Sequence, residues 1–289
     1  MNINVNDYLA EKKNLVDTAL KKYFSDNNPF FDIMYYSLDQ GKRIRPILAI
    51  ASYEANGGRD IGVIMPIACG LELIHTYSLI HDDLPAMDND DYRRGKESAH
   101  KKFGEALAVL SGDGLFAYAF ELFTESEDYL PQRLRIIREI SEAVGPKGVV
   151  YGQVLDIQSH KDLNPKMLRQ IHLNKTAKFI ALSIKVGAIM AQAQEDRIKI
   201  LEKAGLFLGI LFQYTDDILD VTGKKEKLGK TPQKDVLQEK LTAPRVYGLS
   251  GARFRAQRYA TLAKNLFNQL GRNFEIFSQI TDFVLNRSF

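Results

Sequence analysis

Helical periodicity runs through almost the whole chain, and it limits the possible folds more than any other feature. The clearest stretch has its apolar face at Ile198, Leu201, Ala204, Leu208, Leu211, Thr215 and Ile218, every three or four residues. This spacing places the side chains on one face of an α-helix. The strict alternation of a half-buried strand is hard to find over five or more residues. The pattern therefore predicts an all-α protein in which helices pack on helices.

The chain of 289 residues is long enough for one large domain or two small ones, so length alone does not decide between them. It contains no internal repeat, no low-complexity region and no linker long enough to separate two domains. We therefore expect a single domain that spans residues 1–289.

Composition and charge argue against several classes of protein. The net charge is only +3 and the basic residues are scattered, which argues against a nucleic-acid partner. Cys69 is the one cysteine, so the chain has no internal disulfide and fits a reducing compartment. The N-terminus lacks the apolar core of a signal peptide, and the absence of a run of about 18 apolar residues predicts no membrane span. These features predict a cytoplasmic protein.

The short stretch "TDDILD" places three carboxylates at the C-terminal end of a predicted helix. Asp216 and Asp220 are four residues apart, so they share a helix face and repel each other. The negative end of the helix macrodipole adds to the repulsion, so the cluster needs a nearby cation. Magnesium binds through one or two carboxylates together with phosphate oxygens and water. A solvated helix end is the alternative, and this cluster alone does not decide between the two.

A second acidic stretch, "IHDDLPAMDNDDYRRG", has five aspartates followed directly by two arginines. Pro85 disfavours helix at the residue before it, which predicts that the chain breaks there and brings Asp88 back towards Asp82. Guanidinium groups match phosphate oxygens, so Arg93 and Arg94 beside carboxylates suit a metal–diphosphate complex. The alternative is that two surface arginines balance an acidic loop.

Other blocks supply groups that a diphosphate site needs: Lys42, Arg43 and Arg45 in "GKRIRP", Lys175 and Thr176 in "NKT", and Lys230 in "LGKTPQKD". His75 precedes Asp82 by about two helical turns and shares nearly the same helix face. It is either a ligand or a buried core histidine, and the sequence favours neither. Gln213 lies one turn before Asp216 and could place a neutral amide beside the acidic cluster.

In this order, the motifs resemble those of the trans-isoprenyl diphosphate synthase family, closest to its bacterial members that form farnesyl diphosphate. The first aspartate-rich motif of the family matches "DDLPAMD" followed by "YRRG", and the second matches "FQYTDDILD". The blocks "GKRIRP", "LIHTYSLIHDD", "GQVLDIQ" and "NKTAKFIALS" match as well, so the resemblance runs from Gly41 to Tyr247. The family fold, a single large helical bundle around a deep central cavity, is implied by this resemblance alone.

The resemblance implies a site with three Mg²⁺ ions on the diphosphate of an allylic substrate. The metal ligands would be Asp82 and Asp88 from one wall of the cavity and Asp216 from the other. The same diphosphate would be held by three basic residues, Arg93, Lys175 and Lys230. Ionisation of the carbon–oxygen bond would then give an allylic cation.

The resemblance also implies a site for isopentenyl diphosphate, formed by Lys42, Arg45, His75 and Arg94. The cation would be stabilised by Lys175, Thr176 and Gln213. Attack by the isopentenyl double bond would lengthen the chain by five carbons, and the departed diphosphate would accept the final proton. In the first motif, Asp83 is interpreted as a supporting carboxylate, and Asn89, Asp90 and Asp91 as a solvated acidic turn. The family further implies a homodimer.

Product length in this family depends on the residues four and five positions before the first aspartate, here Ser78 and Tyr77. An aromatic ring about 7.5 Å along the helix axis from Asp82 could close the floor of the cavity. Together with the two extra residues in the first motif, this ring implies a C15 product, farnesyl diphosphate. Geranyl (C10) and geranylgeranyl (C20) products stay open, and Tyr77 is otherwise a core residue.

Three other functions compete with this prediction. His81-Asp82, with His75 upstream, suggests an HD-type phosphohydrolase, but that function leaves "DDILD", the paired arginines and "GKRIRP" unexplained. A non-catalytic subunit of a prenyl synthase heteromer tends to lose aspartates from one motif, whereas both motifs are complete here. The isopentenyl-site residues argue against a terpene cyclase. The sequence departs from the family pattern at Gln233, where glycine is usual, and at Ala243, where tyrosine is frequent.

Overall fold

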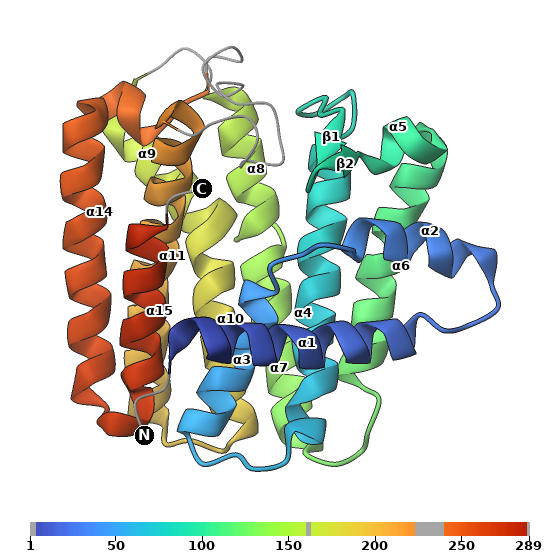
Figure 1. Cartoon of the computed structure of the whole chain (residues 1–289), viewed down its shortest axis with the longest axis horizontal. Helices are drawn as coiled ribbons and strands as arrows, with labels where there is room; N and C mark the ends of the chain where they lie inside the picture. The colour runs from blue at the N-terminus through green and yellow to red at the C-terminus, as the bar shows by residue number, and fades with distance from the viewer. Residues whose placement is uncertain (1–3, 160–162, 223–239, 288–289) are drawn as a thin grey trace.

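The computed structural model describes residues 4–159, 163–222 and 240–287, and it confirms the all-α fold (Figure 1). The described helices are α1 (Val5–Tyr23), α2 (Pro29–Leu38), α3 (Ile44–Ala55), α4 (Ile61–Asp82), α5 (Ala99–Phe103), α6 (Glu105–Phe123), α7 (Leu130–Val144), α8 (Val149–Gln158), α9 (Pro165–Ile171), the π-helix η1 (His172–Ala177), α10 (Lys178–Met190), α11 (Glu195–Thr222), α14 (Ala243–Gln269), the 3₁₀ helix η2 (Arg272–Phe274) and α15 (Glu275–Asn286). In the described ranges, one antiparallel hairpin of two-residue strands, β1 (Tyr92–Arg93) and β2 (Lys96–Glu97), interrupts the helices.

Side-chain caps fix where several helices begin. The side-chain oxygens of Asn4, Asn28, Asp60 and Asn164 accept hydrogen bonds from backbone N–H groups at the starts of α1, α2, α4 and α9. Proline follows directly at the starts of α2 and α9, where its missing N–H group has no helical partner to lose. Asn28-Pro29 and Asn164-Pro165 therefore mark the starts of these two helices.

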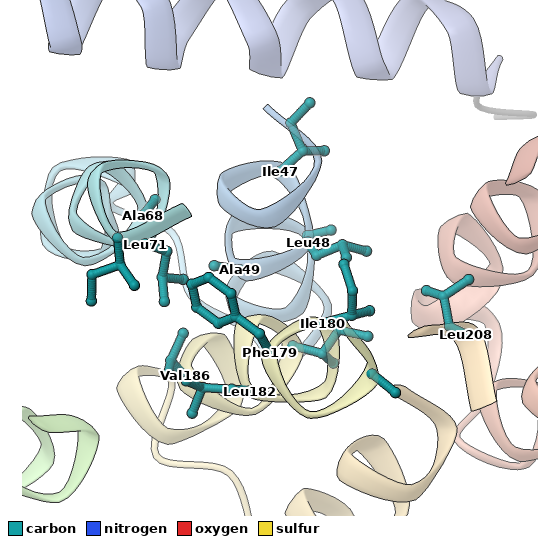
Figure 2. Close-up of a cluster of buried hydrophobic side chains, with 14 of the residues drawn as sticks. Ile47, Leu48, Ala49, Ala68, Leu71, Phe179, Ile180, Leu182, Val186 and Leu208 are labelled. Carbon is teal, nitrogen blue, oxygen red and sulfur yellow. The ribbon is translucent and has the colours of Figure 1, made fainter. Parts of the chain in front are cut away.

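The core lies where α3, α4, α10 and α11 pack together. Figure 2 shows side chains of α3, such as Leu48, against Phe179 and Ile180 of α10, with Leu71 of α4 nearby. Close contact between α3 and α10 depends on Gly187, because a Cβ atom there would lie 2.1 Å from the carbonyl oxygen of Ala49. These helices form a rigid frame around the positions that carry the polar motifs.

The two acidic stretches lie at the same end of the bundle. Helices α4 and α11 both end in the upper part of Figure 1, where the β1–β2 hairpin also lies. The first acidic stretch begins at the last residues of α4, and the second lies in the last two turns of α11. Asp82 and Asp216, which are 134 residues apart in the chain, are thus brought to the same end of the bundle.

Two helices are long and apolar enough to cross a membrane by length and composition, although the chain lacks an uninterrupted apolar run. Helix α4 passes this test because it is a core helix, with 67% of its most apolar window buried inside the protein. In α6 the corresponding value is 39%, so this helix presents apolar side chains at the surface. Burial inside the chain explains the composition of α4 and only part of that of α6.

Candidate active site

A cavity of about 530 Å³ opens between α4, α8, η1, α11 and the C-terminal segment. It brings together every described residue that the motifs assign to metal or substrate binding: Lys42, Arg45, His75, Ser78, Asp82, Asp88, Arg93, Arg94, Lys175, Thr176, Gln213 and Asp216. Of the two residues assigned to product length, Ser78 lines the cavity, whereas the ring of Tyr77 packs against Phe116 of α6, with 5.0 Å between centroids. Lys230 and Gln233 lie outside the described residues.

The first acidic wall of the cavity, formed by Asp82 and Asp88, is a tight loop at the end of α4. The backbone N–H of Asp88 donates to the carbonyl oxygen of Asp82 at 2.8 Å, and that of Asp90 donates to the carbonyl of Asp83 at 3.0 Å. The break predicted from Pro85 is therefore confirmed, and it returns Asp88 to the last turn of α4. Burial raises the pKa of Asp82 to about 6, and the nearby charges of Asp88 and Asp83 contribute to the rise.

On the opposite wall of the cavity, near the end of α11, Asp216 and Asp217 have different surroundings. Asp216 is partly exposed in the cavity. Asp217 is buried. Its carboxylate accepts hydrogen bonds from Gln213 Nε2 at 2.9 Å and from the backbone N–H of Ala243 at 2.8 Å. Its Oδ2 atom also lies 3.1 Å from Nε2 of His172. Asp217 therefore ties α11 to η1 and to the start of α14. The N–H donor at residue 243 comes from the backbone, so it does not depend on the tyrosine that is frequent there in the family.

The carboxylates fit magnesium only together with a phosphate ligand. Among the described residues, no group of three or more Asp, Glu, His or Cys side chains lies close enough to hold a metal ion unaided. Mg²⁺ ordinarily takes one or two carboxylates and completes its shell with substrate phosphate and water. The cavity offers a donor set of this kind. One wall supplies Asp82 and Asp88, the other supplies Asp216, and basic side chains line the same cavity.

Buried basic groups line the α3 side of the cavity. Within the described structure, Nε of Arg45 is buried without a hydrogen-bond partner, and its guanidinium lies 4.9 Å from the centre of the Phe179 ring. Burial lowers the pKa of Arg45 to about 10 and that of Lys42 to about 8. His75 is neutral, because burial and then the charge of Arg45 lower its pKa well below the usual value. An anion bound here would compensate the buried positive charge.

The paired arginines face different partners. Arg93 donates to the carboxylate of Asp83 and, at 3.3 Å, to Asp90, so Asp83 supports an arginine at the cavity wall. The interpretation of Asp90 as part of a solvated turn is wrong: its exposed fraction is 8%, because it packs against this arginine. Its neighbours Asn89 and Asp91 are exposed, as expected.

The guanidinium of Arg94 donates to two backbone carbonyls at the end of α2, those of Ser37 at 2.8 Å and Leu38 at 3.1 Å. Arg93 and Arg94 are adjacent in sequence and both line the cavity, yet the two side chains are anchored to separate parts of the fold. The assignment of the two arginines to two different diphosphates, which the resemblance implies, stays a prediction.

The groups assigned to cation stabilisation lie on the π-helix η1 and on α11. Lys175 Nζ lies 2.7 Å from Asp156 of α8, and Thr176 Oγ1 donates to Gln213 Oε1 at 2.7 Å. Burial opposes the charge of Lys175, but Asp156 and Asp82 outweigh it and raise the pKa of the lysine. Lys175 is therefore a fixed positive charge between α8 and the first acidic wall.

Two basic residues of the site were missed in the sequence. Lys240 lies 3.0 Å from Asp88, and Arg287, just beyond α15, lies 2.7 Å from Asp216 and stacks on Phe212 at 4.0 Å. Lys240 stands in the block "EKLTAP" beside the quoted motif, so position relative to the motif could have found it. No sequence pattern marks Arg287. In this structure both carboxylate walls are paired with a cation from the C-terminal third of the chain.

A polyprenyl synthetase family model matches residues 28–282. The chain is 45% identical over 259 residues to farnesyl diphosphate synthase of Geobacillus stearothermophilus, with 87% of each chain covered. It is 40% identical over 294 residues to geranylgeranyl diphosphate synthase of Cyanophora paradoxa, with 99% of this chain and 98% of the relative covered.

Solved structures agree with the sequence matches. A geranyltransferase of Helicobacter pylori, crystallised with magnesium and isoprenyl diphosphate, superposes with a TM-score of 0.86 at 31% identity, over 99% of this chain and 98% of that one. The chain therefore belongs to the polyprenyl synthetase family, as its two aspartate-rich motifs predict.

Proposed function

We propose that this prenyltransferase condenses isopentenyl diphosphate with dimethylallyl and then geranyl diphosphate, and releases farnesyl diphosphate (C15). The observation that carries the proposal is the single cavity in which two acidic walls face Lys42, Arg45, Arg94 and Lys175. Two diphosphates need this combination, since one must leave with metal ions and the other must stay bound to basic side chains. The similarity to a farnesyl diphosphate synthase supports the C15 product, and the similarity to a geranylgeranyl diphosphate synthase keeps the C20 alternative open.

The reaction begins with loss of the allylic diphosphate. Asp82, Asp88 and Asp216 would hold three Mg²⁺ ions, which supply positive charge to the leaving group when bound. The carbon–oxygen bond breaks and its electron pair leaves with the diphosphate, which Arg93, Lys175 and Lys230 hold. Lys240 and Arg287, which pair with Asp88 and Asp216 in this structure, are close enough to contribute charge as well.

The second step forms the new carbon–carbon bond. The double bond of isopentenyl diphosphate, held by Lys42, Arg45, His75 and Arg94, attacks the allylic cation. The hydroxyl of Thr176 and the amide of Gln213 place oxygen atoms towards the cation without a group that would trap it. The departed diphosphate takes the proton, and the product is five carbons longer.

The product length is proposed to depend on Tyr77. Its ring begins a row of aromatic contacts between α4 and α6, with Phe116 at 5.0 Å from it and Phe120 at 5.1 Å from Phe116. Tyr77 lies one residue before Ser78, which lines the cavity, so the row stands where a growing tail would arrive. We infer that these rings close the floor at the length of a C15 tail.

Product analysis tests both parts of the proposal. With magnesium, dimethylallyl and isopentenyl diphosphates, the protein should give farnesyl diphosphate, and Tyr77→Ala should shift the products towards C20. Tyr35→Ala is the matched control, since Tyr35 is a half-buried tyrosine of α2 that packs on Phe24 away from the cavity. A wild-type C20 product would correct the product length, and release of free phosphate without elongation would refute prenyl transfer.

The geometry of His81 disfavours the phosphohydrolase. Its Nε2 atom lies 3.1 Å from the carbonyl oxygen of Val109 in α6, and the residue is not among the described residues that line the cavity. A His-Asp metal pair needs both side chains on one ion, whereas Asp82 faces the cavity.

We also propose that the chain works as a homodimer in the cytoplasm. Exposed apolar residues on the consecutive, packed helices α6 and α7 support a second copy as the partner: Leu107, Val109, Leu110 and Phe116 on α6, with Leu130 and Leu134 on α7. A cytoplasmic location agrees with a single, buried, free cysteine, Cys69.

A further inference from the structure

Glu72 is a buried carboxylate in the middle of an otherwise apolar helix. It lies on α4, one turn before His75, and its exposed fraction is 1%. An ionised carboxylate in such a position is costly unless cations and hydrogen bonds compensate it. Neither aspartate-rich motif includes it, and the mechanism above gives it no task.

Two guanidinium groups converge on one oxygen of this carboxylate. Arg43 Nη1 donates to Oε1 of Glu72 at 2.8 Å, and Arg94 Nη2 lies 3.6 Å from the same atom. The charge of Glu72 is also the largest effect that keeps Arg45 protonated against its burial. Three arginines from two separate chain segments thus depend on one acidic group.

The backbone around Glu72 is held in an unusual conformation. Arg43 and Arg94 both have positive φ angles, 56° and 55°. Each such residue costs on the order of 1–3 kcal/mol, and it persists only where surrounding contacts fix it. The space is also tight, because a Cβ atom on Gly41 would lie 2.2 Å from Arg43 Nη1 and 2.8 Å from Glu72 Oε1. Arg43 directly precedes α3, and Arg94 lies in the turn of the β1–β2 hairpin, so two local turns bring these side chains to Glu72.

The charges around Glu72 leave a positive excess that faces the cavity. Asp17 of α1 accepts from Arg43 Nε at 2.7 Å, so Arg43 has a carboxylate on each side and is only 2% exposed. His75 is neutral, and Arg43, Arg45 and Arg94 all line the cavity. Because two carboxylates compensate Arg43, the positive charge that an anion would meet is mainly that of Arg45 and Arg94.

We infer that Glu72 is the positioning residue of the isopentenyl diphosphate site, where it fixes Arg94 and the Arg43–Arg45 segment around one carboxylate. This inference rests on the proposed function, because it concerns the second diphosphate of that reaction. A positioning role and a simple counter-charge role predict opposite effects on diphosphate binding when Glu72 is removed. A counter-charge weakens the attraction for a diphosphate, so its removal would strengthen binding. A positioning residue holds the arginines in the binding geometry, so its removal weakens binding.

Glu72→Gln separates the two possibilities. The amide keeps the shape and one acceptor oxygen but loses the charge that holds two cations together, so Arg94, the more exposed of the two, should move away. We expect the KM for isopentenyl diphosphate to rise at least about tenfold, since small displacements of binding groups have effects of this size. The KM for geranyl diphosphate should change by less than about threefold. Glu72→Asp keeps the charge at a shorter reach and should give an intermediate rise.

The control is Glu54→Gln on α3. Glu54 accepts hydrogen bonds from Lys12 Nζ at 2.6 Å and from the hydroxyl of Tyr8 at 2.7 Å, so it is also paired and partly buried, but it does not line the cavity. Both KM values should stay unchanged in this variant. A lower KM for isopentenyl diphosphate in Glu72→Gln, or an equal rise for both substrates, would overturn the inference. If Glu72→Gln does not fold, the same criteria are applied to Glu72→Asp.

A binding measurement keeps this test separate from the proposed function. Calorimetric titration of the metal-free protein with isopentenyl diphosphate should show weaker binding for Glu72→Gln by the same factor. Wild-type protein that binds this ligand but forms no longer prenyl diphosphate would refute the proposed function, and the titration would still decide the role of Glu72. Equal affinities of wild type and Glu72→Gln would refute the positioning role alone.

Discussion

The burial of Asp82, a proposed metal ligand, lowers the stability of the folded chain at neutral pH. Burial raises the pKa of its carboxyl from 3.8 to about 6, so the folded chain binds a proton there more tightly than the unfolded chain does. Between about pH 4 and pH 6 the folded state therefore holds more protons. In this range the stability falls as the pH rises, and above it the full penalty for a buried charge remains.

Asp82→Asn is therefore expected to stabilise the metal-free protein at pH 7, by up to roughly 3 kcal/mol for a shift of about two pKa units. The gain should shrink towards pH 4, where wild-type Asp82 is already protonated in the folded chain. Thermal unfolding with a chelator present, between pH 4 and pH 8, measures both effects. The same variant should lose magnesium-dependent turnover, because an amide is a weaker ligand for a hard cation.

Asp91→Asn is the matched control for this measurement. Asp91 is an exposed aspartate of the same loop and lies 3.2 Å from Lys101, so its loss should change stability by less than about 0.5 kcal/mol. Equal unfolding temperatures for wild type and Asp82→Asn at pH 7 would show that the carboxylate is not destabilising.

Single residues also mark the limit of what the sequence can predict. The return of Asp88 to Asp82 follows from Pro85, because proline acts locally on the preceding backbone. The burial of Asp90 could not be predicted in this way, because it depends on where Arg93 points after the hairpin has formed. Arg287 is the extreme case, since it lies 71 residues from Asp216 and no motif connects the two.

At the scale of elements, η1 is held between two close helix contacts. A Cβ atom on Gly152 of α8 would lie 2.3 Å from the backbone nitrogen of Lys175, and one on Gly209 of α11 would lie 2.5 Å from Cα of Ala177. Both neighbouring helices therefore contact the backbone of η1 directly. The position of Thr176 is fixed by this packing as much as by its own hydrogen bond.

Gly209→Ala is expected to separate α11 from η1. The added methyl group meets backbone that cannot move aside, at a cost of about 1–3 kcal/mol, which exceeds the gain of up to about 1 kcal/mol in helix propensity. We expect a lower denaturation midpoint and a lower kcat, because the 2.7 Å contact between Thr176 and Gln213 spans this interface. Denaturant unfolding and steady-state kinetics measure the two effects.

Gly251→Ala in α14 provides the comparison. A Cβ atom there would meet only the Tyr247 side chain of its own helix, at 3.0 Å. Its stability should stay equal or rise slightly, and its kcat should stay unchanged. A Gly209→Ala protein that behaves in the same way would show that the close approach of α11 is not needed.

Helix starts could be predicted better than helix interiors. Asn28-Pro29 and Asn164-Pro165 combine a capping side chain with a proline that suits the first turn, and both signals act within a few residues. The stretch from residue 165 to residue 190 gives no sign that six of its residues form a π-helix. That conformation follows from packing against α8 and α11, which a local pattern does not contain.

For the whole molecule, the composition of α6 has a consequence that α4 does not share. Both helices are long and apolar enough for an apolar environment, but α4 is 67% buried inside the chain over its most apolar window and α6 only 39%. Figure 1 shows α6 at the side of the bundle, with α14 at the opposite side. A second copy packed on α6 and α7 would cover the apolar side chains that the single chain leaves exposed.

Leu110→Glu tests this assembly. The side chain of Leu110 is 53% exposed on α6, so the substitution leaves the core intact but places a charge in the proposed interface. We expect the dimer to be weakened by about 2 kcal/mol or more, measured as a lower mass in light scattering after size-exclusion chromatography. Phe254→Glu on α14, where the phenylalanine is 69% exposed, should leave the mass unchanged. A wild-type monomer would contradict the proposal.

The bundle itself could be predicted only in part. Periodicity predicts helices, but the place of the cavity depends on how the helices pack, and Phe179 both packs among the buried side chains of Figure 2 and lines the cavity. That information is spread over many apolar residues whose identities are interchangeable. The resemblance to a family supplied what the periodicity could not.

Because η1 is a π-helix, the number of residues between α9 and α10 affects where the site side chains point. Helices α9, η1 and α10 follow one another without a break, and η1 holds more residues per turn than an α-helix does. Deleting Thr176 or Ala177 would allow a regular helix and would turn the part of this helix before the deletion by about 100° relative to α10. Lys175 would then point away from its partner Asp156 on α8, although it was still present. A change in the length of this segment would therefore displace side chains that it leaves unchanged.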